Sequence, residues 1–142
     1  MGRRHQKALG GAYAGHGRTL YVSETPPARL WAFDFVAPGE VALVPGLRGM
    51  AGRFLYASPG IAAFDSLAIE AGGNVCVATI GHSRITVVAP DGVLVEHVPT
   101  DDPFTTNIAF GGPDMCTAFV TLSGTGRLVS RLWPRPGLRL NS

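Results

Sequence analysis

Apolar and β-branched residues occur along the chain in short runs that come in pairs, and most runs are flanked by Gly, Pro or Ser. Such runs are typical of β-strands joined by tight turns. No window shows a sustained apolar stripe with a period of 3.6 residues, so we expect little or no helix. The six clearest runs cover residues 18–24, 28–35, 73–80, 83–90, 116–123 and 126–133.

The three pairs of runs share one pattern. A valine in the first run is followed seven positions later by an arginine and then by an aliphatic residue. The valines are Val22, Val77 and Val120, and the arginines are Arg29, Arg84 and Arg127. The spacing of the copies is close to the blade period of β-propellers, roughly 40–50 residues. The sequence therefore predicts an all-β fold with three antiparallel meanders, centred near residues 21–35, 67–88 and 108–132, with the arginines at hairpin loops or strand edges.

Asp65 opens the apolar segment "DSLAIEA", where an unpaired buried charge would cost several kcal/mol. Asn107 opens the corresponding segment "NIAFGG" of the next copy. The innermost strand of a propeller blade lines the central channel, so both side chains could face the channel mouth. An acid or amide that caps backbone groups at a strand end, or that faces solvent, is the alternative. The first copy has only "LGGA" (Leu9–Ala12) at this place, with no polar side chain.

Composition narrows the class of protein. The chain has 142 residues, of which 15% are charged, so disorder is not expected. Basic residues gather only at Arg3, Arg4 and Lys7, which gives no basic face for nucleic acid, and no apolar run is long enough to span a membrane. Cys76 and Cys116 lie among apolar strand residues without a CxxC pair, so we expect buried, reduced thiols and a cytoplasmic location.

Several motifs in order make the chain similar to a known family. The stretch "FDSLAIEAGGNVCVATIGHSRITVVAPDGVLVEHVP" is followed by "TTNIAFGGPDMCTAFVTLSGTGRL", and "GRTLYVSETPPARLWAFDF" precedes both. Together they resemble the C-terminal half of the SMP-30/gluconolactonase/LRE family, over residues 17–136. The resemblance implies that residues 17–142 are half of a six-bladed β-propeller, about three blades. Residues 1–16 match nothing in the family, and we expect them to be irregular.

The family resemblance also implies chemistry. Members open sugar lactones with one divalent metal (calcium, zinc or manganese) held by a Glu, an Asn and an Asp. Asp65 matches the Asp, as metal ligand and catalytic carboxylate, and Asn107 matches a position that lines the channel. The Asn ligand should fall near Leu9 to Gly11 and is absent, and the Glu belongs to a half that this sequence does not contain. His82, in a predicted hairpin loop, is the rival general base, and Ser66 lacks the GxSxG context of a serine hydrolase.

The sequence thus predicts a gluconolactonase-like, metal-dependent lactone hydrolase by resemblance, in a form that is truncated and inactive by itself and binds metal weakly at best. The alternatives are a non-catalytic half-propeller, or a protein-binding scaffold that functions only by assembly. The expected partners are a sugar lactone and further copies of the chain, which would associate through open blade faces. No nucleic acid or membrane partner is expected.

Overall fold

A computed structural model of the chain describes residues 8–14, 18–46 and 48–140. Within these ranges the chain forms strands, turns and irregular segments and no helix, and hence no helix that could cross a membrane. The twelve strands are β1 (Ala8–Ala14), β2 (Thr19–Glu24), β3 (Arg29–Ala37), β4 (Glu40–Val41), β5 (Arg53–Ala57), β6 (Ala63–Ile69), β7 (Val75–Ile80), β8 (Arg84–Val88), β9 (Leu94–Pro99), β10 (Thr105–Gly111), β11 (Thr117–Leu122) and β12 (Arg127–Leu132).

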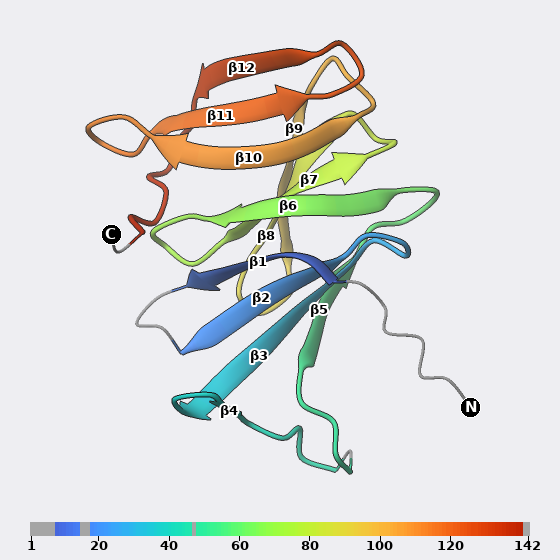
Figure 1. The fold of residues 1–142 in the computed structure, drawn as a ribbon, viewed down its shortest axis with the longest axis vertical. Helices are drawn as coiled ribbons and strands as arrows, with labels where there is room; N and C mark the ends of the chain where they lie inside the picture. The colour runs from blue at the N-terminus through green and yellow to red at the C-terminus, as the bar shows by residue number, and fades with distance from the viewer. Residues whose placement is uncertain (1–7, 15–17, 47, 141–142) are drawn as a thin grey trace.

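The strands form three antiparallel sheets that follow one another along the chain. The first blade holds β1–β5, with β4 and β5 both paired to β3; the second has the order β6-β7-β8-β9; and the third has the order β10-β11-β12. Figure 1 shows the second blade between the other two. The arrangement is part of a β-propeller, so the predicted fold class of about three blades is confirmed.

The repeat seen in the sequence corresponds to one hairpin in each blade. Each repeat valine lies within the second strand of its blade, and each repeat arginine is the first residue of the third strand. Thus Val22 faces Trp31 across the β2–β3 ladder, Val77 faces Thr86, and Val120 faces Val129. The arginines Arg29, Arg84 and Arg127 stand at strand edges beside the turns, as predicted.

Two apolar layers hold the blades together, because alternate residues of each strand point to opposite faces of its sheet. The seam between the first and second blades buries Leu30, Phe64 and Val77, among others. The seam between the second and third blades buries Ile85 and Val120 with their neighbours. The middle blade is therefore apolar on both faces, whereas each outer blade contributes one face to these layers.

The C-terminal residues fasten the third blade to the second. The side chain of Glu70 is 1% exposed and accepts hydrogen bonds from Trp133 Nε1 (2.7 Å) and Arg135 Nε (2.6 Å). Asn74 Nδ2 also donates to it at 2.8 Å. The backbone N–H of Leu138 donates to the carbonyl of Ile69. Because the backbone N–H of Gly137 also donates to the carbonyl of Met115, this C-terminal clip fixes the end of β6 relative to the turn between β10 and β11.

The expectation of an irregular segment at residues 1–16 is wrong for residues 8–14. This stretch, "ALGGAYA", forms β1 and pairs with β2 from Ala14↔Thr19 to Ala8↔Glu24. Pairing to a well-formed neighbouring strand overrides the weak strand propensity of Ala and Gly. Residues 1–7 and 15–17 lie outside the described residues, so that part of the expectation stays a prediction.

Candidate functional site

The inner strands of the three blades bring Asp65 and Asn107 to the same side of the molecule. β6 is in contact with both β1 and β10, and the three arrows run the same way in Figure 1, so their first residues lie at one end. Asp65 is the third residue of β6, and Asn107 is the third residue of β10. We call this end, where the three inner strands begin, the strand-start rim.

Each inner strand also carries a register shift near its start. The shifts lie between Ala8 and Gly11 in β1, between Phe64 and Leu67 in β6, and between Thr105 and Asn107 in β10. A bulge leaves one residue out of the ladder and re-aims nearby side chains, and bulges are common next to active sites. The local motif around Asp65 is thus an irregular strand start in which Asp65 and Ser66 have no ladder partners of their own.

Asp65 is half-buried, and its carboxylate has no cationic partner within 4.0 Å among the described residues. Burial raises its pKa above the ordinary aspartate value, and the hydrogen bond from the backbone N–H of Ser66 offsets only part of that rise. Its backbone carbonyl accepts a hydrogen bond from Ser23 Oγ at 2.8 Å, and Ser23 is fully buried. Ser23 therefore ties the bulge of β6 to the first blade.

Asn107 is exposed, and its side chain is engaged locally. Its Oδ1 accepts a hydrogen bond from the backbone N–H of Ile108 at 2.8 Å. This contact is the strand-end capping that the sequence left open as the alternative for this residue. Thr106, which precedes it in the bulge, is close to Ser123 Oγ (2.7 Å) and Thr121 Oγ1 (3.0 Å), so hydroxyl groups surround the start of β10.

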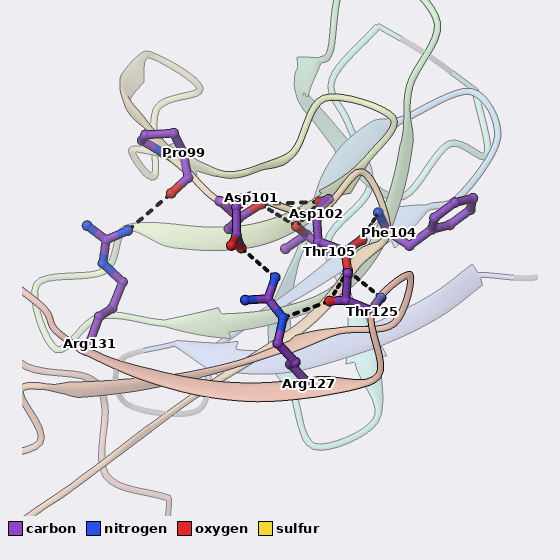
Figure 2. A network of polar contacts seen from close by, with 9 residues as sticks. Pro99, Asp101, Asp102, Phe104, Thr105, Thr125, Arg127 and Arg131 are labelled. Atoms are coloured by element: carbon purple, nitrogen blue, oxygen red, sulfur yellow. Dashed lines mark hydrogen bonds and ion pairs between the residues drawn. The ribbon is translucent and has the colours of Figure 1, made fainter.

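A buried aspartate that sequence reasoning missed fixes the start of β10. Asp102 belongs to the β9–β10 loop, and Figure 2 shows it beside Thr125 of the β11–β12 turn. Asp102 is fully buried, and its carboxylate accepts hydrogen bonds from the backbone N–H of Phe104 and from both the N–H and Oγ1 of Thr125, each at 2.7 Å. Burial works to raise the pKa of Asp102, but these hydrogen bonds lower it below the ordinary value. The motif "DP" was the available signal, since Asp commonly organises turns.

The arginine of the third repeat supports the same corner. Arg127 contacts the Asp101 carboxylate at 2.9 Å and donates from Nε to Thr125 Oγ1 at 2.8 Å (Figure 2). The Asp101 side chain is 70% exposed. An exposed pair contributes at most about 1 kcal/mol, so this contact mainly orients the turn.

Two histidines of the second blade lie toward the same end of the blade as Asp65. His82 is in the β7–β8 turn, just after Ile80, which pairs with Ala63 at the start of β6. His97 is in β9. Burial, with the nearby charges of Arg84 and His82, lowers the pKa of His97. Neither histidine forms an ion pair or hydrogen bond with Asp65 among the described residues, so the structure gives no support to His82 as its rival.

Both cysteines are unpaired, as the sequence predicts. Cys76 is buried, and burial raises the pKa of its thiol far above the ordinary value. Cys116 is half-buried rather than buried. Its position next to the β10–β11 turn, at the start of the last hairpin, accounts for the difference.

The described residues do not by themselves fit a divalent metal centre. No group of three or more His, Cys, Asp or Glu side chains that could hold a metal ion occurs among them. Calcium takes six to eight oxygen ligands, and zinc takes four. At the strand-start rim, Asp65 offers one carboxylate without a cationic partner, which is one suitable ligand and not a complete set.

Three comparisons bear on this arrangement. The family model for the SMP-30/gluconolactonase/LRE-like region matches residues 10–124. A 6-deoxy-6-sulfogluconolactonase from Pseudomonas putida is 29% identical over 119 residues, which are 82% of this chain and 39% of that protein. The chain therefore spans about two fifths of the length of this curated relative.

Solved structures agree on the fold. A luciferin-regenerating enzyme superposes with a TM-score of 0.69 at 25% identity, over 81% of this chain and 37% of that one. A gluconolactonase from Xanthomonas campestris superposes with a TM-score of 0.69 at 24% identity, over 88% of this chain and 37% of that one. At that identity the second likeness speaks for the fold alone.

Proposed function

Because the chain belongs to the SMP-30/gluconolactonase/LRE-like family, we propose that it carries part of a sugar-lactone hydrolase site, and that Asp65 is its contribution to a divalent metal. The observation that supports Asp65 is its setting: a half-buried carboxylate in a bulge at the strand-start rim, without a cationic partner among the described residues. The relative from Pseudomonas putida acts, by its name, on a sulfonated gluconolactone, which makes a sugar lactone the substrate class we propose.

The chemistry proposed for Asp65 follows from its charge and position. Lactone hydrolysis is acyl transfer to water, and a bound divalent cation would polarise the lactone carbonyl. A carboxylate at the rim can hold that cation or accept a proton from an attacking water. Burial raises the pKa of Asp65 and so makes its carboxylate a better proton acceptor than that of an exposed aspartate.

The 142-residue chain alone should not be a lactonase. One carboxylate with water leaves most of the coordination sphere of calcium, zinc or manganese without protein ligands. In β1, the backbone of Leu9 to Ala12 occupies the place of an inner strand, and these residues have no side-chain oxygen. Metal binding should therefore be weak, and turnover should need ligands that these residues do not supply.

An assembly role is the second candidate. Large apolar side chains are exposed on the outer blades, among them Phe54 (54%) and Leu132 (86%), and such surface commonly marks a protein contact. On this alternative the chain is a scaffold that functions only with another chain, and Asp65 has no metal to hold. The two unpaired cysteines favour a reducing compartment, and so a cytoplasmic location, under either proposal.

Paramagnetic broadening by Mn²⁺ tests the metal role of Asp65 even when binding is weak. Amide signals of the ¹⁵N-labelled chain are recorded while MnCl₂ is added at substoichiometric amounts. We expect the amides of residues 64–67 to broaden first, because they surround the Asp65 carboxylate. The variant Asp65→Asn should remove this effect.

The matched control is Asp91→Asn, which alters an exposed carboxylate in the "PDG" turn. It should leave the broadening near Asp65 unchanged. If Mn²⁺ broadens exposed acidic turns as strongly as residues 64–67, or if Asp65→Asn changes nothing at the rim, the metal role is refuted. The assembly role would then be the better account.

A further inference from the structure

The two outer blades each present an open face. Comparison of equivalent repeat positions shows that these faces are equivalent to faces that are buried between blades elsewhere in the molecule. Leu30, Ile85 and Leu128 occupy the same repeat position, directly after the arginine. Leu30 is 0% exposed and Ile85 is 1% exposed, because each is packed in an inter-blade seam. Leu128 is 69% exposed. The third blade thus has the same face as the first two, without a blade packed against it among the described residues.

The first blade is open on the opposite face, as the valine position of the repeat shows. Val77 and Val120 are 0% and 1% exposed, because each faces the blade that precedes it in the chain. The equivalent Val22 is only half-buried, and it lies across the ladder from Trp31. We call this open face of the first blade the leading face; it carries Leu20, Val22, Trp31, Phe33 and Phe54. We call the open face of the third blade the trailing face; it carries Ala109, Phe119, Thr121, Leu128 and Ser130.

The two open faces match the two sides of an inter-blade seam, and the molecule already contains two such seams. In both existing seams, a trailing face of one blade packs on the leading face of the next. The leading face is rich in large aromatic side chains, including a T-shaped Trp31–Phe54 pair with ring centroids 5.5 Å apart. The trailing face combines Phe119 and Leu128 with small residues, so the bulky side chains of one can fill the spaces of the other.

One molecule cannot bring its own two open faces together. They lie at opposite ends of the stack of three blades, with the second blade between them (Figure 1). Two molecules related by a two-fold axis can pair both faces at once, because the trailing face of each then meets the leading face of the other. If each face buries about 400 Å², the two seams bury about 1,600 Å² in all, which is the size of a standard stable interface.

We propose that two copies of this chain associate head to tail, with the trailing face of each third blade packed on the leading face of the partner's first blade, in a closed ring. This inference rests on the repeat and on the exposure of its equivalent positions, and it is independent of the proposed lactone chemistry. It identifies a second copy of the chain as the partner.

Light scattering after size-exclusion chromatography, with the purified chain between about 1 and 100 μM, gives the first test. The expected mass is twice the chain mass of 14.9 kDa. Val22→Glu places a charge on the leading face, and Leu128→Glu places one on the trailing face. Either variant alone lacks both intact seams, so each should be monomeric, with its dissociation constant raised at least about 100-fold. Val95→Glu, on the outer strand β9 of the second blade, is the matched control and should remain dimeric.

Mixing the two variants distinguishes head-to-tail pairing from any symmetric pairing of identical faces. The Val22 variant keeps its trailing face and the Leu128 variant keeps its leading face, so together they can form one intact seam. With one variant carrying a fluorescent label, their mutual dissociation constant should be at least tenfold lower than that of either variant with itself. Circular dichroism and a cooperative urea transition verify that both variants fold. Phe54→Glu, on the edge strand β5, replaces Val22→Glu if that variant does not.

Three results would overturn the proposal. A monomeric wild-type chain at 100 μM would leave the open faces for a different covering partner. A Leu128 variant that stays dimeric while the Val22 variant dissociates would show that leading faces pair with each other. Masses above the dimer that grow with concentration would show the seam repeating without closure.

Discussion

Replacing Glu70 by glutamine should destabilise the C-terminal clip. Oε1 of Glu70 accepts from Trp133 Nε1, and Oε2 accepts from Arg135 Nε and Asn74 Nδ2. The thiol of Cys76 lies 3.6 Å from Oε1. Each oxygen thus faces two donors, so the amide NH₂ of a glutamine meets two donors in either orientation.

The magnitude follows from these contacts. A hydrogen bond to a charged group contributes about 1.5–3 kcal/mol, and a buried donor left without an acceptor costs about 1–3 kcal/mol. Breaking a buried ion pair costs about 3–5 kcal/mol. The Arg135 side chain is 34% exposed and also contacts Glu96, so part of its charge stays compensated. We therefore expect Glu70→Gln to lower the free energy of unfolding by about 3 kcal/mol, a large part of the ~5–15 kcal/mol typical of a domain.

Urea unfolding followed by tryptophan fluorescence measures this loss, with all proteins at one chain concentration because association would add to stability. The control is Glu96→Gln, which removes the other carboxylate of Arg135. The Glu96 side chain is 37% exposed, so its loss should cost no more than about 1 kcal/mol. A Glu70→Gln protein within 1 kcal/mol of the wild type, or a larger loss from the Glu96 change, would refute the reasoning.

The dependence of stability on pH gives a second test of the role of Glu70. Burial works to raise the pKa of Glu70, but the hydrogen bonds from Arg135, Trp133 and Asn74 lower it below the ordinary value. The carboxylate therefore contributes stability that is fully present above the unfolded pKa of about 4.3 and is lost as the pH falls through the lower folded pKa. The wild type should lose this part of its stability on acidification below about pH 4, and Glu70→Gln should lack it.

Two further changes test the placement of other buried groups. Ser23→Ala removes the hydrogen bond to the carbonyl of Asp65. It should lower the free energy of unfolding by about 1 kcal/mol and speed amide hydrogen exchange at the β6 bulge. Unchanged exchange at the bulge would contradict the contact that Ser23 makes between the blades. Because Cys76 is buried with a raised thiol pKa and Cys116 is half-buried, a thiol reagent should modify Cys116 first in the native chain; faster labelling of Cys76, read by peptide mass, would show that the second seam opens readily.

The local sequence pattern was enough to predict the fold, because each blade is built from strands that are neighbours along the chain. The hairpins around Val22, Val77 and Val120 pair residues close in sequence, and their apolar character and turn residues predict them. The strand at residues 8–14 was missed because its pairing with β2, and not its own composition, makes it extended.

The candidate site was predictable only in part. Asp65 stood out as an acid in an apolar strand, but the register shift that surrounds it depends on how β6 pairs with β7. The partners of Glu70, Trp133 and Arg135, lie more than 60 residues away, so the local sequence does not predict these contacts. Ser23 is also distant in sequence from the carbonyl that it binds, at a separation of 42 positions.

Hydrolysis of glucono-1,5-lactone, followed with a pH indicator, tests the central claim most directly. The 142-residue chain and Asp65→Ala are assayed in parallel with added calcium, zinc or manganese, and spontaneous hydrolysis is subtracted. Since Asp65 is one ligand of an incomplete set, both proteins should give the background rate with every metal. Metal-dependent turnover by the wild-type chain that disappears in Asp65→Ala would contradict this account, because it would show that these residues complete a working lactonase site.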